Sequence, residues 1–308
     1  MNISDLMRCG NVSKRFGKIR ETESLWKIVD LRRCKAVKPD FIKFLLDKGC
    51  ERLNLLGATI AKGSLKLDGP SKLRCLSLRN DPALKEILNS CYILQKLALQ
   101  GQRCDFHFVK ELVLRNCKTL QTIDLTYFDW LKDVSKVDFF GRCLELTEFK
   151  ITGITNYNFR SDQLDLMIDS LPPNLLKVEF THFEELSDLH IEKLVRKCDK
   201  ITAISLFYTC VTNQSVTTIV RYLKNSLEVL DLQGCGYVSL DTIFEAVRNL
   251  TQLKILFYDC EGSCMKYAKP PKMCGTCESL MKKRPGLITY GYDHGNMIAD
   301  FDKGLYDD

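Results

Sequence analysis

The sequence predicts a right-handed α/β solenoid, in which short parallel strands alternate with helical segments along 308 residues. An apolar-x-x-apolar-x-apolar pattern begins at nine positions, with steps of 23, 21, 26, 26, 29, 26, 26 and 26 residues between them. Every framework position is apolar, from Cys50 in the first pattern to Tyr258 in the last. Because a fixed period of this length is typical of stacked repeats, we expect one array. The patterns begin at Cys50, Leu73, Leu94, Leu120, Leu146, Leu175, Ile201, Leu227 and Leu253.

Each pattern predicts a short strand followed by a helical segment. The residues three and five steps after the start point into the core, and those at steps two, four and six face outward. Between the strands, segments such as 83–91 and 191–198 carry apolar residues three and four apart, as amphipathic helices do. Stacking then places a parallel sheet on the concave face and helices on the convex face, with one core between them.

Composition excludes several classes of protein. Lys and Arg exceed Asp and Glu by only 45 to 39 and the charges are interspersed, so we expect no nucleic-acid partner. No stretch reaches 18 uninterrupted apolar residues and no secretory signal is present, which predicts a protein of the cytoplasm or nucleus without a membrane partner. In that setting the 15 cysteines are expected to be reduced.

Four cysteines share one place in the repeat. Cys91, Cys117, Cys143 and Cys198 each lie three residues before a pattern start, where a small thiol packs as a compact apolar group. With Cys235 in the turn 232–235, these positions resemble the cysteine-containing subtype of leucine-rich repeats that is typical of F-box proteins.

The residues before the first pattern resemble the second half of an F-box. The segments that carry this resemblance are Val12-Ser13-Lys14-Arg15-Phe16, Ser24-Leu25-Trp26 and Val29-Asp30-Leu31. The resemblance covers about 30 residues, and the first helix of an F-box would precede Met1. It implies binding to a Skp-type adaptor, for which the candidate contact residues are Leu6, Met7, Val12, Phe16, Leu25 and Trp26. The alternative is a capping helix, in which Trp26, Leu25 and Ile28 cover the exposed core of the first repeat.

A cysteine-rich tail follows the last pattern. Cys260, Cys264, Cys274 and Cys277 have three, nine and two residues between them, and His294 follows. Four thiolates in such an arrangement can bind zinc, although the first pair departs from the usual C-x-x-C spacing, and packing of ordinary thiols at the end of the array is the alternative. We therefore expect three regions: 1–48, a partial F-box and linker; 49–258, the repeats; and 259–308, a cap or tail.

The sequence carries no recognisable catalytic motif. The four histidines, His107, His182, His190 and His294, form no metal pair, and neither a phosphate-binding loop nor a Gly-x-Ser-x-Gly turn is present. We expect a non-catalytic protein that needs no cofactor.

A target protein is expected to bind the concave face. Its outward strand positions have mixed charge, and Phe207 with the adjacent Tyr208 offers an aromatic anchor. The candidate contact residues are Arg79, Lys96, Asp124, Glu148, Lys150, Lys177, Glu179, Phe207 and Asp231. Together with the resemblance, this predicts a substrate-recognition subunit of a cullin-based, SCF-type ubiquitin ligase that holds an unidentified protein substrate for degradation. The alternatives are a leucine-rich-repeat scaffold without a ligase, and a zinc-dependent module that uses the tail.

Overall fold

The computed structural model describes residues 18, 21–79, 85–101, 106–126, 139–153, 161–260 and 274–290. The chain divides into two compact units, Met1–Gln100 and Gly101–Asp308. Within the described residues, no helix is both long enough and apolar enough to cross a membrane.

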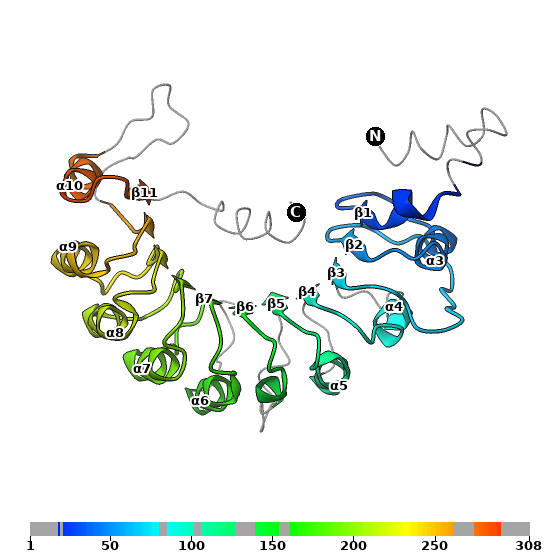
Figure 1. Ribbon diagram of the computed structural model, residues 1–308, viewed down its shortest axis with the longest axis horizontal. Helices are drawn as coiled ribbons and strands as arrows, with labels where there is room; N and C mark the ends of the chain where they lie inside the picture. The colour runs from blue at the N-terminus through cyan, green and yellow to red at the C-terminus, as the bar shows by residue number, and fades with distance from the viewer. Residues whose placement is uncertain are drawn as a thin grey trace. The chain divides into compact units, whose positions relative to one another are not determined.

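The described residues of the first unit form four parallel strands in chain order (Figure 1). Strand β1 pairs with β2, β2 with β3 and β3 with β4. Pro39 begins helix α3, where its fixed φ favours the first helical turn, and α3 buries Ile42 and Leu45. The elements are η1 (Glu23–Trp26), β1 (Ile28–Asp30), α3 (Pro39–Asp47), β2 (Arg52–Leu55), β3 (Cys75–Arg79), α4 (Lys85–Asn89) and β4 (Lys96–Gln100).

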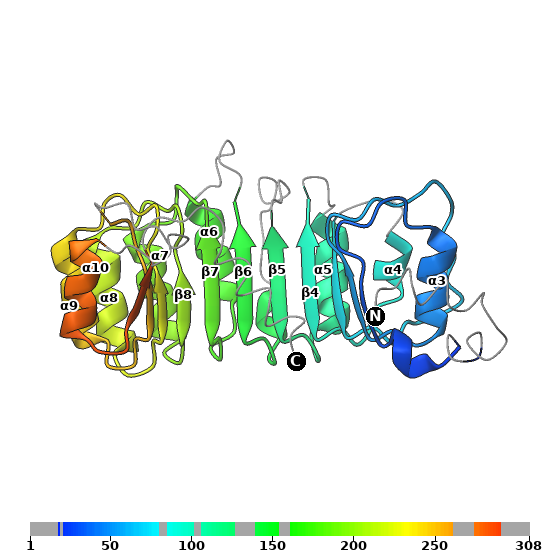
Figure 2. The ribbon, with the colours of Figure 1, turned by 90° about the horizontal axis from the view of Figure 1, so that it is seen from above.

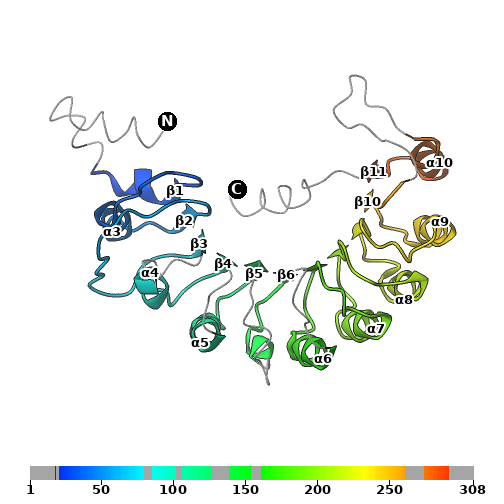
Figure 3. The same cartoon turned by 180° about the vertical axis from the view of Figure 1, so that it is seen from behind.

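The second unit shows the same alternation, and its described residues form seven parallel strands, each paired with the next along the chain (Figure 2). Helices α6 to α10 lie together on one side of this sheet, as the view from behind also shows (Figure 3). The elements are α5 (Phe106–Asn116), β5 (Thr122–Thr126), η4 (Phe140–Arg142), β6 (Glu148–Thr152), α6 (Ser161–Ser170), β7 (Lys177–Thr181), α7 (Asp188–Lys197), β8 (Ala203–Ser205), α8 (Asn213–Leu223), β9 (Val229–Asp231), α9 (Leu240–Asn249), β10 (Ile255–Phe257), α10 (Gly275–Lys283) and β11 (Ile288–Tyr290).

The predicted framework forms the core. All 27 framework side chains are at most 2% exposed, from Cys50 to Tyr258. In the second unit, Phe140, Phe149, Phe180 and Phe183 form a chain of ring contacts with centroid distances of 5.0, 6.0 and 6.1 Å. The strand register and inward positions predicted from the repeat are therefore confirmed.

The array has one further strand at each end. Trp26, Val29 and Leu31 follow the same apolar spacing as the nine patterns, are all buried, and place β1 beside β2. At the other end, β11 pairs with β10, and Thr289 of β11 is paired with the framework residue Leu256. Backbone pairing therefore continues the sheet past the nine patterns, and Leu287 is buried there.

The cysteines of the shared repeat position are buried as predicted in three of four cases. Cys91, Cys143 and Cys198 are fully buried, and Cys117 is half-buried. Burial raises the pKa of Cys143 to about 12 and that of Cys198 to about 11, so both stay protonated near neutral pH. These thiols are structural apolar groups with low reactivity.

Asp188 joins two neighbouring repeats of the second unit. Its carboxylate accepts hydrogen bonds from the backbone and side chain of Thr212, at 3.0 and 2.8 Å, and of Ser215, at 3.1 and 2.5 Å. Burial by itself would raise the pKa of Asp188, but the hydrogen bonds from Ser215 and Thr212 outweigh it and hold the pKa below its usual value. Because Thr212 and Ser215 begin α8, the carboxylate also neutralises the positive end of that helix.

Asp188→Ala is expected to lower the free energy of unfolding by about 2 to 3 kcal/mol, since it leaves several donors at the start of α8 without their acceptor. Urea unfolding followed by circular dichroism measures this difference. The exposed Asp199→Ala is the control and is expected to change the value by less than about 0.5 kcal/mol. An equal effect of the two variants would contradict the role of Asp188 as a link between repeats.

Candidate functional site

The sheet of the second unit has one face toward helices α5 to α10 and an opposite face, which we call the inner face. Alternate residues of each strand lie on it, and the register aligns them in rows across the strands. The middle row carries most of the charge and consists of Asp124, Lys150, Glu179, Ser205, Asp231 and Phe257.

The charged residues of the middle row pair with one another. Lys150 Nζ lies 3.8 Å from Asp124 and 3.5 Å from Glu179, and these three residues are 8%, 5% and 4% exposed. Burial raises the pKa of Glu179 to about 7, although the ammonium group of Lys150 opposes this shift. The prediction that these residues contact a partner at the surface is therefore wrong for this structure, because they form a buried ion-paired cluster.

Asp231 is likewise buried, at 1% exposed, and not at the surface as predicted. Its carboxylate accepts hydrogen bonds from the Ser205 hydroxyl at 2.7 Å and from the Gln233 backbone N–H at 3.0 Å. Burial raises the pKa of Asp231 to about 6, and these two hydrogen bonds limit the shift. Asp231 thus stabilises the turn after β9, and its partners lie within the chain.

Two predicted charged residues remain partly accessible. Glu148 and Lys177 are neighbours in the row that includes the first residues of β6 and β7, and their charged groups are 2.7 Å apart. Their side chains are 30% and 41% exposed, so this ion pair is available to a partner. In the first unit, Arg79 is exposed at the end of β3 and Lys96 is half-buried at the start of β4.

An aromatic cluster lies beyond the carboxyl ends of β7 and β8. Phe207 and Tyr208, both half-buried, have ring centroids 4.6 Å apart, and His182 stacks on Tyr208 at 5.1 Å. Burial lowers the pKa of His182, so its ring is neutral at physiological pH. The sequence predicted the two adjacent aromatic residues but not His182, which comes from the preceding repeat.

The backbone at this cluster is strained. In several repeats the chain adopts positive φ seven residues after the pattern start, and glycine holds this place in some of them, as Gly57 (φ 69°) and Gly234 (φ 74°) show. His182 (φ 58°) and Tyr208 (φ 52°) hold the same place, at a cost of about 1 kcal/mol each relative to glycine. Strain of this kind is concentrated at functional sites, which favours the cluster as a binding feature.

An apolar row lies on the inner face of the last strands. Val229, Ile255 and Ile288 are aligned by the pairing of β9, β10 and β11, and Ile288 is 46% exposed. Phe257, half-buried, occupies the next inner position along β10. The predicted contact residues do not include this apolar row, although the repeat pattern places Ile255 and Phe257 outward.

At the N-terminal end, the structure separates the two described adaptor candidates. Leu25 is 38% exposed, whereas Trp26 is 1% exposed and packs edge-on against Phe44 of α3, with ring centroids 5.2 Å apart. Trp26 therefore does not present its ring to a partner, because it fills the first core position of the β1 unit. The other adaptor candidates, Leu6, Met7, Val12 and Phe16, lie outside the described residues.

A surface pocket of about 290 Å³ lies at helices α6 and α7 and contains His190 and Ser161. The Ser187 backbone N–H donates to His190 Nδ1 at 3.0 Å, so the proton of the neutral ring is on Nε2. Nε2 lies 3.3 Å from the Ser161 hydroxyl and 3.2 Å from the Ser161 carbonyl oxygen, to which it donates. This tautomer does not activate the hydroxyl as a base, and His190 instead completes the N-terminal cap of α7.

Three of the four predicted zinc ligands come together near the end of the array. The sulfur atoms of Cys260, Cys274 and Cys277 all lie within 4.8 Å of one another. Cys264 and His294 lie outside the described residues.

Comparison with known proteins supports the fold. No family model matches the chain. Lysine-specific demethylase 2B of Mus musculus is 20% identical over 295 residues, which is 93% of this chain but only 19% of the demethylase, so the chain spans about a fifth of that protein. A chain in the crystal structure of the Rad7 and Elc1 complex in yeast has a TM-score of 0.55 and 14% identity, covering 83% of this chain and 65% of that one. The leucine-rich-repeat-containing protein LegL7 of Legionella pneumophila has a TM-score of 0.44 and 13% identity, covering 77% of this chain and 82% of its own. The repeat period, the parallel strand order and the likeness to the Rad7 complex together assign this chain the leucine-rich-repeat solenoid fold.

Proposed function

We propose that this chain is the substrate-recognition subunit of a cullin-based, SCF-type ubiquitin ligase in the cytoplasm or nucleus. The observation that carries the proposal is the way the F-box-like residues enter the repeats. Ser24-Leu25-Trp26 lies in η1, and Val29-Asp30-Leu31 covers the end of β1 and the residue after it and buries Val29 and Leu31. This is the order that the F-box resemblance implies, with the box leading directly into the array.

The inner face of the second unit supplies the proposed target-binding surface. Its accessible features are the Phe207 and Tyr208 rings, the apolar row that ends at Ile288, and the Glu148–Lys177 ion pair. Half-buried aromatic groups on a rigid support are favourable anchors for a partner protein. The chain would hold the target and raise its effective concentration near a conjugating enzyme, and the transfer chemistry would belong to the partners.

A second candidate, a repeat scaffold without a ligase, is favoured by one specific observation. Trp26 is buried against α3, as expected for a residue that caps the first repeat. A capping role accounts for Trp26 and Val29 completely, but it gives no reason for Leu25 to remain 38% exposed beside them. The two candidates therefore differ in whether Leu25 contacts an adaptor.

The purified chain is expected to bind a purified Skp-type adaptor, and Leu25→Arg is expected to weaken that binding at least about tenfold, because a charged group would replace an apolar contact. Isothermal titration calorimetry measures the affinity. Leu144→Arg is the matched control, since Leu144 is 68% exposed and belongs to the second unit, and its affinity should equal that of the wild type.

Failure of the wild-type chain to bind the adaptor, while its circular dichroism spectrum shows a folded protein, would reject the ligase proposal and favour the scaffold. Equal affinities of Leu25→Arg and the wild type would also reject the proposed role of Leu25. Co-purification of a cullin with the tagged chain from cells provides a second measurement that supports the ligase.

A further inference from the structure

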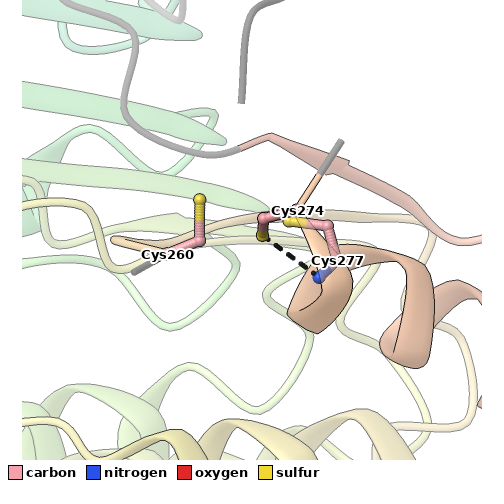
Figure 4. Close-up of side chains that lie close together, drawn as sticks. All are labelled: Cys260, Cys274 and Cys277. Atoms are coloured by element: carbon pink, nitrogen blue, oxygen red, sulfur yellow. Dashed lines mark hydrogen bonds between the residues drawn. The ribbon is translucent and has the colours of Figure 1, made fainter. Parts of the chain in front are cut away.

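Three cysteine sulfurs from two separate segments converge beside α10, the last helix among the described residues. Cys260 follows β10, whereas Cys274 and Cys277 begin α10, 14 and 17 positions later in the sequence. Their sulfur atoms lie within 4.8 Å of one another, and Figure 4 shows the side chains gathered at the start of that helix. The other described cysteines lack such a group of three, and the cluster is independent of the inner face.

The surroundings of the cluster favour thiolates. Cys274 is the N-cap of α10, and its sulfur accepts a hydrogen bond from the Cys277 backbone N–H at 3.5 Å (Figure 4). The positive end of a nine-residue helix stabilises negative charge at both positions. An N–H donor directed at one sulfur of a Cys-x-x-Cys turn is what a metal-bound thiolate requires.

Tyr258 supplies a second donor from the preceding strand segment. Its hydroxyl lies 3.2 Å from Cys277 Sγ, and both groups are buried. A phenol hydroxyl donates to a thiolate, and such contacts around metal ligands fix their orientation and strengthen metal binding.

From these contacts we infer that Cys260, Cys274 and Cys277 form a structural zinc site that fastens α10 to the end of β10. Zinc prefers thiolate ligands at about 2.3 Å in a tetrahedron, which places the sulfurs about 3.8 Å apart and thus needs only small movements here. Binding forms three zinc–sulfur bonds and releases the proton of each thiol that was protonated. The fourth position of the tetrahedron is left to water or to a ligand beyond these three residues.

The site would stabilise the terminal strand. Helix α10 leads directly into β11, which pairs with β10, and Arg284 after the helix donates to the carbonyl oxygens of Val247 and Leu250. Leu280 and Leu287 are buried there, but the residue paired with the framework residue Leu256 is Thr289, which is not apolar. A metal that joins Cys260 to α10 would therefore stabilise this repeat, as the apolar framework stabilises the other repeats.

The full chain, purified without chelators, is expected to contain about one zinc ion per molecule by inductively coupled plasma mass spectrometry. Cys274→Ser and Cys260→Ser are expected to lower the content to below about 0.3, since each removes one of the three ligands among the described residues. Cys34→Ser and Cys210→Ser replace exposed thiols elsewhere and should retain the wild-type content. Tyr258→Phe should bind zinc about tenfold more weakly while keeping the stoichiometry.

Cobalt provides a readout that does not depend on metal picked up during purification. Metal-free chain titrated with Co²⁺ is expected to show a thiolate-to-cobalt charge-transfer band, and Cys274→Ser should lose it while Cys210→Ser keeps it. A wild-type chain with neither stoichiometric zinc nor this band would overturn the inference. A disulfide between two of the three cysteines in chain purified under reducing conditions, detected by peptide mass spectrometry, would overturn it as well.

Discussion

Lys150→Met is expected to lower the free energy of unfolding at pH 7.5 by about 3 to 5 kcal/mol. The ammonium group of Lys150 lies between the carboxylates of Asp124 and Glu179, and all three side chains are at most 10% exposed. Methionine keeps the length of the side chain but removes the charge, so two carboxylates remain close together in a poorly solvated place. Urea unfolding followed by circular dichroism gives the difference, with the midpoint as the primary measure.

Lys177→Met is the matched control, because Lys177 begins the next strand and forms its ion pair with Glu148 at the surface. Exposed ion pairs contribute little, so this variant should lose less than about 1 kcal/mol. The triple variant Asp124→Leu, Lys150→Met, Glu179→Leu is expected to recover most of the stability, since apolar side chains of similar size often replace a buried ion cluster without loss. Equal losses for Lys150→Met and Lys177→Met would show that the middle row is solvated like the surface.

The repeat period predicted the fold almost completely because it reports burial directly. Each apolar framework residue must be covered by the next repeat, so the spacing determines both the strand register and the core. The same spacing was present at Trp26, Val29 and Leu31, and it identifies β1 as part of the array. Trp26 was assigned to a partner surface because its family resemblance was given more weight than its place in the repeat.

The candidate site was predicted less well, because sequence spacing shows which face a side chain lies on but not whether it is accessible. Asp124, Lys150 and Glu179 lie on the expected face, yet they are buried by pairing with one another across three strands. A lysine flanked by acidic residues one repeat before and one repeat after was the available signal, since equivalent positions become neighbours.

The aromatic cluster and the thiol cluster needed the structure for another reason. His182 and Tyr208 both adopt positive φ at equivalent places in successive repeats, and the signal was an aromatic residue at a place that glycine holds in several repeats. For the thiols, the spacing of Cys274 and Cys277 predicted a shared turn. That Cys260 reaches them depends on how the chain returns to α10 after β10.

The buried cluster also determines how the inner face responds to pH. Glu179 has its pKa raised by burial to about 7, above the usual 4.5, so the folded state binds the proton more tightly than the unfolded state does. The contribution of Glu179 to the free energy of unfolding should therefore be greatest below about pH 4.5 and should fall as the pH rises toward 7. Burial raises the pKa of Asp231 to about 6, so its contribution to stability also falls with rising pH, but over a lower pH range.

Glu179→Gln is accordingly expected to reduce the loss of stability between pH 5 and pH 8 by about 3 kcal/mol, since a glutamine matches the protonated carboxyl in shape and carries no charge at any pH. Urea unfolding at both pH values measures this loss in the wild type and the variant. The exposed Glu184→Gln should leave it unchanged. If the stability of the wild type rises from pH 5 to pH 8 and that of Glu179→Gln follows the same curve, then ionising Glu179 in the folded state costs little free energy. In that case the ammonium group of Lys150 would outweigh the burial of the carboxylate, and the middle row would be stabilising when fully charged.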